Sequence, residues 1–211
     1  DQITGQVWRT DGTPNGTILI KDNIVPSFSL SFLNIIYHVF KNRAYFLIDD
    51  GVHPGDALYS TDGIDATTTH TTFLKDLGSS TFVGSSLLAD AFNLPDKFIF
   101  PYSDDGQTIF DFYECNGTGA GTVVFKSFPP NANSNIPLIY SNINFNQLNQ
   151  TITYPLYNGN FYFSADDVTH GNESWMSDGT RSSMVKDIIP GLAAGLVPHN
   201  RWHYTSDGFF F

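Results

Sequence analysis

The chain has 211 residues and a net charge of −11 at neutral pH, and its aromatic residues are 19 Phe, 10 Tyr and 3 Trp. So acidic a chain repels phosphate backbones and anionic lipid, which argues against nucleic acid as a partner. Membrane insertion is not expected either, because no apolar run approaches the roughly 18 residues that a spanning helix needs. The single cysteine, Cys115, excludes an internal disulfide.

The composition also favours strands over helices. Lys, Glu, Ala and Arg, the usual residues of exposed helices, are scarce, whereas aromatic residues, Thr, Ser, Asn and Gly are common. The hydrophobic content of 41% is ordinary, so we expect a real core and no global disorder. The sequence therefore predicts an all-β protein.

Taken in chain order, the predicted elements repeat. Four times an aromatic residue precedes an Asp-Gly or Asn-Gly turn, and a short apolar strand follows that includes or ends in Lys. The four phrases begin at Trp8, Tyr59, Tyr113 and Trp175, at intervals of 51, 54 and 62 residues. The strands that follow the turns contain residues 19–22, 73–76, 124–127 and 184–187.

Three repeats also have an upstream aromatic strand that ends in paired acids, at residues 44–51, 98–106 and 161–167. Its alternation predicts a half-buried strand, and Asp-Gly predicts a tight hairpin after the next strand. Four short antiparallel strands, in units of about 50 residues, cannot bury both faces alone. We therefore expect a β-propeller of four blades in one domain, 1–211, or a segment of a longer array. A solenoid is disfavoured by the long period, and a sandwich would not need a repeated phrase.

The repeated phrase resembles the bacterial ELWxxDGT repeat. Residues 161–191, FYFSADDVTHGNESWMSDGTRSSMVKDIIPG, match it nearly throughout, with Ser174 in place of the family's Leu. Residues 5–22 match well and residues 44–76 more loosely, and the third copy has Asn116 in place of Asp. The resemblance implies a propeller-like array on secreted or cell-surface proteins. It carries over no catalytic residue.

The repeats are permuted relative to the chain ends. The chain begins after the first strand of a blade and ends within such a strand, at residues 208–211. Phe209, Phe210 and Phe211 are expected to complete the first blade of the same chain, or a blade of a neighbouring copy or longer parent chain. A free strand edge is a template for pairing, and head-to-tail contacts that do not close produce filaments.

Three pairs of adjacent aspartates close the first hairpin of three repeats. They are Asp49 and Asp50, Asp104 and Asp105, and Asp166 and Asp167. Carboxylates in a turn can bind Ca²⁺ with backbone oxygens, and no other cofactor is indicated. Because no DxDxDG loop is present, we favour the interpretation that these residues form Asx turns.

The sequence identifies no catalytic residue. His53 and His170 occupy matching positions in two repeats, and we interpret them as turn contacts because no HExxH motif accompanies them. The nucleophile elbow GxSxG is absent, although a Ser-His-Asp triad could be assembled in space. Cys115 is interpreted as a small apolar core residue.

Four sequons are candidate N-glycosylation sites on a secreted protein. Their asparagines are Asn15, Asn116, Asn149 and Asn172. Asn15 and Asn116 fall in predicted turns. Asn149 lies in the polar insert 129–157, which we expect to be the most variable loop.

The function that these observations favour is a non-enzymatic extracellular module, structural or adhesive, that could repeat head-to-tail in a surface filament. Its expected partners are copies of itself and glycans. One alternative is a carbohydrate-binding, lectin-like propeller, which requires exposed tryptophans, whereas Trp8 and Trp175 lie in a strand where we expect burial. Another is a hydrolase or lyase, which requires clustered carboxylates or histidines at the axis.

Overall fold

Strands and turns make up the described part of the chain. The computed structural model describes residues 5–25, 37–54, 56–78, 88, 91–102, 110–128, 138–139, 156–195, 203–205 and 208–210. These residues form sixteen strands and no α-helix, so the all-β prediction is confirmed. Within the same ranges, no helix is long and apolar enough to cross a bilayer.

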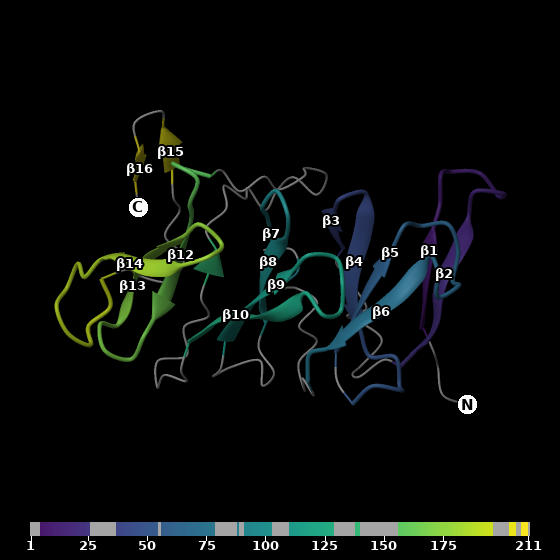
Figure 1. Cartoon of the computed structure of the whole chain (residues 1–211), viewed down its shortest axis with the longest axis horizontal. Helices are drawn as coiled ribbons and strands as arrows, with labels where there is room; N and C mark the ends of the chain where they lie inside the picture. Colours follow the sequence, from purple (N-terminus) through teal and green to yellow (C-terminus); the bar gives the residue numbers. More distant parts are fainter. Residues whose placement is uncertain are drawn as a thin grey trace. The chain divides into compact units, whose positions relative to one another are not determined.

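The strands form five antiparallel sheets, each of which follows the order of the sequence (Figure 1). The N-terminal hairpin contains β1 (Gly5–Arg9) and β2 (Ile18–Ile24). The second sheet contains β3 (His38–Phe40), β4 (Arg43–Ile48), β5 (Ala57–Thr61) and β6 (Thr71–Asp76). The third sheet contains β7 (Phe92–Asn93), β8 (Phe98–Tyr102), β9 (Phe110–Cys115) and β10 (Thr122–Phe128). The fourth sheet contains β11 (Leu138–Ile139), β12 (Phe161–Asp166), β13 (Asn172–Ser177) and β14 (Ser182–Lys186), and the C-terminal hairpin contains β15 (His203–Thr205) and β16 (Gly208–Phe210).

The chain divides into two compact units. One comprises Asp1–Gly106 with Tyr113–Val123, and the other comprises Gln107–Phe112 with Val124–Phe211. The division passes through β9 and β10, so the two ends of these strands belong to different units. Each unit has apolar contacts of its own.

In the first unit, the second sheet is covered on both faces. One face packs on the N-terminal hairpin, where Val7 and Ile20 belong to the same buried cluster as Phe46. The other face contributes Tyr45 to a cluster with Phe98 of β8, and the two rings lie 4.7 Å apart. Consequently β4 and β5 are buried almost throughout, which a strand that alternates between core and solvent would not be.

In the second unit, aromatic rings of the third sheet contact the fourth sheet. Phe112 meets Phe163 edge-on at 4.9 Å, and Phe128 meets Trp175 edge-on at 5.7 Å. Edge-to-face contacts of this kind add to the free energy gained by burial alone. All six residues of β12 are buried, so the prediction of a half-buried strand is wrong here: the strand is covered on both faces.

One cross-strand pair recurs in the three complete sheets. A phenylalanine of the second strand stacks on an aromatic residue of the third strand, at interplanar angles of 13° to 21°. The pairs are Phe46 with Tyr59, Phe100 with Tyr113, and Phe163 with Trp175. The aromatic member of each pair is the residue that opens the repeated turn phrase.

The turn after β12 contains a strained residue. Val168 has a φ of +64°, and Gly51 has a φ of +67° at the equivalent position after β4. A β-branched residue is strongly disfavoured in this left-handed region because its side chain crowds the backbone. The fourth sheet therefore stores strain that the second sheet avoids.

We expect the substitution Val168→Gly to raise the free energy of unfolding by about 1 kcal/mol, since the relief of strain exceeds the added flexibility of glycine. Urea unfolding monitored by circular dichroism would measure the change. The matched substitution Gly51→Val should be destabilising, because it adds the same strain and its Cβ atom would also crowd Val25. A loss of stability in Val168→Gly would contradict the expectation.

Candidate functional site

The Asp-Gly turns are held by equivalent hydrogen bonds in all four repeats. The side chain before the Asp or Asn accepts a hydrogen bond from the glycine N–H at 2.9 to 3.4 Å, and these acceptors are Thr10, Thr61, Cys115 and Ser177. The Asp or Asn Oδ1 atom accepts from the N–H two residues later at 2.7 to 3.0 Å, and these residues are Asp11, Asp62, Asn116 and Asp178. This pattern is an Asx turn, so these groups stabilise the turns themselves.

Asp50 is the centre of a hydrogen-bonded cluster at the turn after β4. Its Oδ1 atom accepts from the N–H groups of Val52 and His53 at 3.0 and 2.9 Å. Its Oδ2 atom accepts from the Tyr59 hydroxyl at 2.6 Å and from His53 Nδ1 at 2.8 Å. The carboxylate is buried, and the His53 ring stacks on Phe73 at 3.8 Å.

The cluster fixes the charge states of its members. Burial alone would raise the pKa of Asp50, but the hydrogen bonds from His53, Tyr59 and Val52 outweigh it and hold the pKa far below its ordinary value. The pKa of Tyr59 is raised well above its ordinary value by burial and by the bond to Asp50. At neutral pH the carboxylate is therefore anionic and the phenol neutral, so neither is suited to proton transfer.

The fourth sheet has a related cluster. Asp167 Oδ1 accepts from the N–H groups of Thr169 and His170 at 3.0 and 2.9 Å, and Oδ2 lies 2.8 Å from His170 Nδ1. The hydrogen bond to Asp167 raises the pKa of His170. Asp166 Oδ1 accepts from the N–H two residues later at 2.7 Å.

The two clusters differ in their third member. In the second sheet, Tyr59 donates to the aspartate, whereas Trp175 at the equivalent position donates to the Ala165 carbonyl oxygen at 3.1 Å. The shared part is therefore the aspartate, its turn and the histidine. An aspartate and a histidine that recur in this way are more typical of a structural turn than of a reaction centre.

Where the structure describes them, the carboxylate oxygen atoms of the acidic pairs accept hydrogen bonds mainly from their own turns. Asp49 Oδ1 accepts from the Gly51 N–H at 2.9 Å, and Asp104 and Asp105 lie outside the described residues. In the part of the chain that the structure describes, no three His, Cys, Asp or Glu side chains are grouped so as to hold a metal ion. Calcium binding at the pairs stays a prediction.

Three histidines are oriented by aspartates, which is the arrangement of a general base. Besides His53 and His170, His70 Nδ1 lies 2.8 Å from Asp62 Oδ2, and this raises the pKa of His70. Among the described residues, however, no Ser or Cys side chain hydrogen-bonds to any of the three, so they lack a nucleophile. Burial raises the pKa of Cys115, which disfavours its reactive thiolate.

The sequons fall in different surroundings. Asn15 and Asn116 are exposed in turns, although Asn116 Oδ1 accepts from Thr118. Asn172 is buried at 2% exposure, so a glycan there would require local opening of β13. Asn149 lies outside the described residues, as does most of the insert 129–157.

Trp8 is 52% exposed, so the prediction that it would be buried is wrong, whereas Trp175 is buried at 8% as predicted. The difference lies in the number of strands that the structure describes beside this position. Within the described residues β1 pairs only with β2, whereas the equivalent strand β13 lies between β12 and β14. Burial of this aromatic position depends on the second strand of its sheet.

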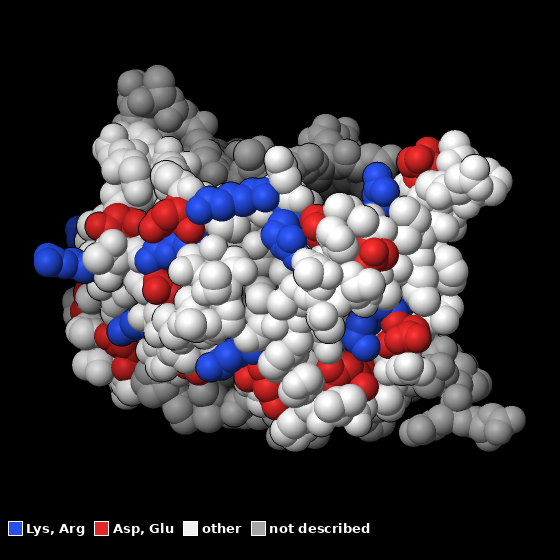
Figure 2. Space-filling view, turned by 45° about the vertical axis from the view of Figure 1, so that its right-hand side comes forward, with Lys and Arg blue, Asp and Glu red and all other residues white. Residues whose placement is uncertain are grey.

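A cavity of about 520 Å³ lies beside Trp8 in the first unit. Its aromatic and polar lining includes Trp8, Tyr37, Arg9, Asn42, Arg43 and Asp62. Aromatic faces beside planar polar groups suit the stacking and hydrogen bonding of a neutral polar ligand. On the face drawn in Figure 2, acidic and basic side chains are interspersed, so no patch of one sign indicates a highly charged ligand there.

The C-terminal hairpin places two of the three predicted closure residues in a strand. In β16, Phe209 pairs with Tyr204 and Phe210 pairs with His203. Phe211 lies outside the described residues. The structure describes no partner strand for β16 other than β15.

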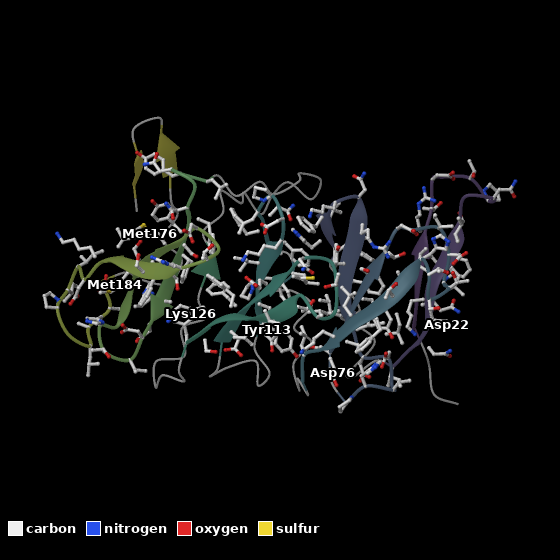
Figure 3. All side chains as sticks on the ribbon, in the orientation of Figure 1. Asp22, Asp76, Tyr113, Lys126, Met176 and Met184 are labelled. Atoms are coloured by element: carbon white, nitrogen blue, oxygen red, sulfur yellow. The ribbon has the colours of Figure 1, made fainter. Side chains whose placement is uncertain are left out.

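Sequence reasoning assigned no role to the recurring lysine after each turn. Lys21 lies over the Tyr59 ring at 5.4 Å, and Lys126 lies over the Trp175 ring at 5.7 Å (Lys126 is labelled in Figure 3). Each lysine thus covers the aromatic residue of the following sheet in a cation–π contact. In the sequence, the recurring spacing between this lysine and the next turn phrase could have indicated the contact.

Asp50→Asn should lower the free energy of unfolding of the first unit by about 2 kcal/mol, because a buried anion that accepts from Tyr59 and His53 is lost. The folded-state pKa of Asp50 lies below its unfolded value. Its stabilisation is therefore present above about pH 4 and is lost as the pH falls through the folded-state pKa. Urea unfolding of both proteins across the acidic range would test this.

The control for this prediction is Asp49→Asn, which alters the neighbouring, less buried carboxylate. It should change the free energy of unfolding by much less. Parallel pH profiles for wild type and Asp50→Asn would contradict the assignment of the acid sensitivity to Asp50.

No family model and no curated protein matches the chain. Among solved structures, a chain from a structural and mechanistic study of two prolyl endopeptidases is similar, with 12% identity and a TM-score of 0.42. The match covers 82% of this chain and 23% of that one, so the chain spans about a quarter of the length of that protein. A likeness this distant establishes neither a shared fold nor a shared activity.

Proposed function

We propose that the chain is a non-enzymatic extracellular module, structural or adhesive, built from four repeats as a β-propeller or propeller segment. Copies join head-to-tail into a surface filament by completing a shared sheet. The extracellular placement is supported by the resemblance to ELWxxDGT repeats and by the sequons. The mode of assembly is supported by the hairpins at the two ends of the described chain.

The two hairpins have the features of complementary halves of one sheet. β1 and β2 are joined by an Asp-Gly turn, as the third and fourth strands of the second sheet are. β15 and β16 are joined by two residues, as the first and second strands of the second sheet are. Within the described residues, each hairpin therefore has the pair of strands that would complement the other.

The exposed ring of Trp8 is the observation that carries the proposal. Its counterparts Tyr59, Tyr113 and Trp175 each stack on a phenylalanine from the strand before them. An exposed tryptophan beside an unpaired strand edge is a favourable site for strand addition, because the edge supplies hydrogen bonds and the ring supplies buried area.

The register of the hairpins supports a particular partner for Trp8. In the complete sheets, the stacked phenylalanine lies three residues after the residue that closes the first hairpin turn. Arg43, Lys97 and Asn160 close these turns, and Phe46, Phe100 and Phe163 are the stacked residues. Gly208 closes the turn of the C-terminal hairpin, so the same count selects Phe211. We expect Phe211 of one copy to stack on Trp8 of the next.

The lysine contacts extend the same match. Lys21 and Lys126 each cover the aromatic residue of the next sheet, and Lys186 holds the equivalent position in the fourth sheet. We therefore expect Lys186 of one copy to lie over the Trp8 ring of the next copy. A ring contacted on both sides would account for a tryptophan at this position.

Trp8→Ala should weaken self-association by about 30-fold, the loss typical of a central interface tryptophan. Val52→Ala, which truncates an exposed apolar side chain of the first unit that does not line the cavity beside Trp8, should leave it unchanged. Light scattering across a concentration series and electron microscopy of the full chain would measure the difference. A wild-type chain that stays monomeric at all concentrations would contradict filament assembly and favour closure within one chain.

The cavity beside Trp8 favours carbohydrate binding as a second candidate function. Sugar rings would stack on the exposed faces of Trp8 and Tyr37, with Asn42 and Asp62 available for hydroxyl groups. In that case a dextran or N-acetylglucosamine oligosaccharide should quench tryptophan fluorescence, and Tyr37→Ala should weaken the effect about 10-fold. Fluorescence that is insensitive to both sugars would exclude this candidate for these ligands.

A further inference from the structure

Glu173, in β13 of the fourth sheet, is a fully buried carboxylate with an unpartnered oxygen atom. Its exposure is 0%, and its Oε1 atom accepts one long hydrogen bond, 3.5 Å, from the Ile189 N–H. Its Oε2 atom has no hydrogen-bond partner among the residues that the structure describes. An ionised carboxylate in this state is strongly unfavourable unless a positive charge compensates it.

A second carboxylate, that of Asp187, comes from the segment that follows β14. Ser174 pairs with Lys186, so Glu173 and Asp187 are each next to a paired residue, and the N–H of Ile189, two residues after Asp187, points to the Glu173 carboxylate. Asp187 Oδ1 is also buried without a partner. The pKa of His170 is raised mainly by its bond to Asp167, and the charges of Asp187 and Glu173 add to the effect. The negative charges of both carboxylates therefore act on the turn that contains His170.

The segment 187–195 brings further oxygen atoms to this place. A Cβ atom on Gly195 would collide with the Glu173 carboxylate, so the segment lies directly against it. The carbonyl groups of Leu192 and Ala193 lie in the same way against Gly171, two residues before Glu173. Gly171 immediately precedes β13, so these oxygen atoms lie near the start of the strand that carries Glu173.

We propose that Glu173 and Asp187, together with backbone carbonyl groups of residues 187–195, form a Ca²⁺ site in the fourth sheet. The two carboxylates balance the charge of the ion. Ca²⁺ accepts about six to eight oxygen ligands in irregular geometry, so carbonyl groups and water complete the shell, whereas Mg²⁺ requires a nearly regular octahedron. Only two acidic side chains contribute to the site, and backbone carbonyl groups supply its other protein ligands.

The second sheet provides an internal comparison. There Ala57 stands opposite Asp76, the aspartate labelled in Figure 3, so the second carboxylate is missing. The Asp76 Oδ1 atom accepts from the Gly78 N–H at 3.0 Å. The strand position thus tolerates alanine, and Glu173 is not required to form the sheet. Its retention as a buried acid in the fourth sheet is explained by a bound cation.

The test is thermal unfolding of the full chain after dialysis against EDTA, with and without about 1 mM CaCl₂. We expect Ca²⁺ to raise the unfolding midpoint by about 5 °C, because it binds the folded state alone. Glu173→Gln and Asp187→Asn should abolish the shift, whereas Asp76→Asn should retain it. Calorimetric titration of CaCl₂ should detect binding to the wild type and to Asp76→Asn only.

Three results would overturn the proposal. A midpoint that is indifferent to Ca²⁺ would exclude the site. A Ca²⁺ shift that survives in Glu173→Gln would place the ion elsewhere, for example at Asp49 and Asp50. A wild-type midpoint that ignores Ca²⁺ but rises as the pH falls would indicate that Glu173 and Asp187 share a proton instead.

Discussion

Stacking between a phenylalanine and an aromatic residue on the two inner strands is the interaction on which the rest of the structure depends. It appears in each complete sheet, as Phe46 with Tyr59, Phe100 with Tyr113, and Phe163 with Trp175. The rings fix the register of the inner strands, and their apolar surroundings require cover from a neighbouring sheet. A single sheet of this kind cannot be stable alone, because both of its faces are apolar. The repeat is therefore a physical necessity.

Much of the fold could be predicted from the sequence, because the signals are local. The alternation within residues 44–51 and 161–167 indicates strands, and the structure forms β4 and β12 there. Asp-Gly and Asn-Gly indicate hairpins, and the four hairpins form with shared hydrogen bonds. The prediction of tight turns is wrong, because loops of four to nine residues join these strands. The exposure of Trp8 could not be predicted, because it depends on whether another strand lies beside β1. The four donors to Asp50 could not be predicted either, since Tyr59 is brought to it by strand pairing.

The turns also explain why an acidic chain need not have an acidic site. Asp11, Asp62 and Asp178 accept backbone hydrogen bonds, and Asn116 does the same without a charge. The property that the turn needs is an oxygen acceptor, and the carboxylate charge is incidental to it. Carboxylates that satisfy their own turns have little left for a ligand. Glu173, which lies in a strand, differs because its Oε2 atom has no hydrogen-bond partner among the residues that the structure describes.

Repeats provide a local standard for what each position requires, and departures from it indicate function more clearly than any single motif does. At the stacked position, three sheets cover their aromatic residue and the N-terminal hairpin leaves Trp8 exposed. Two residues before the stacked aromatic residue of the third strand, the second sheet has Ala57 and the fourth sheet has the buried Glu173. Natural sequences keep such local conflicts where something outside the chain resolves them. In our proposals the group that resolves the conflict is an aromatic strand for Trp8 and a cation for Glu173, so the two sites differ in chemistry and can be tested independently.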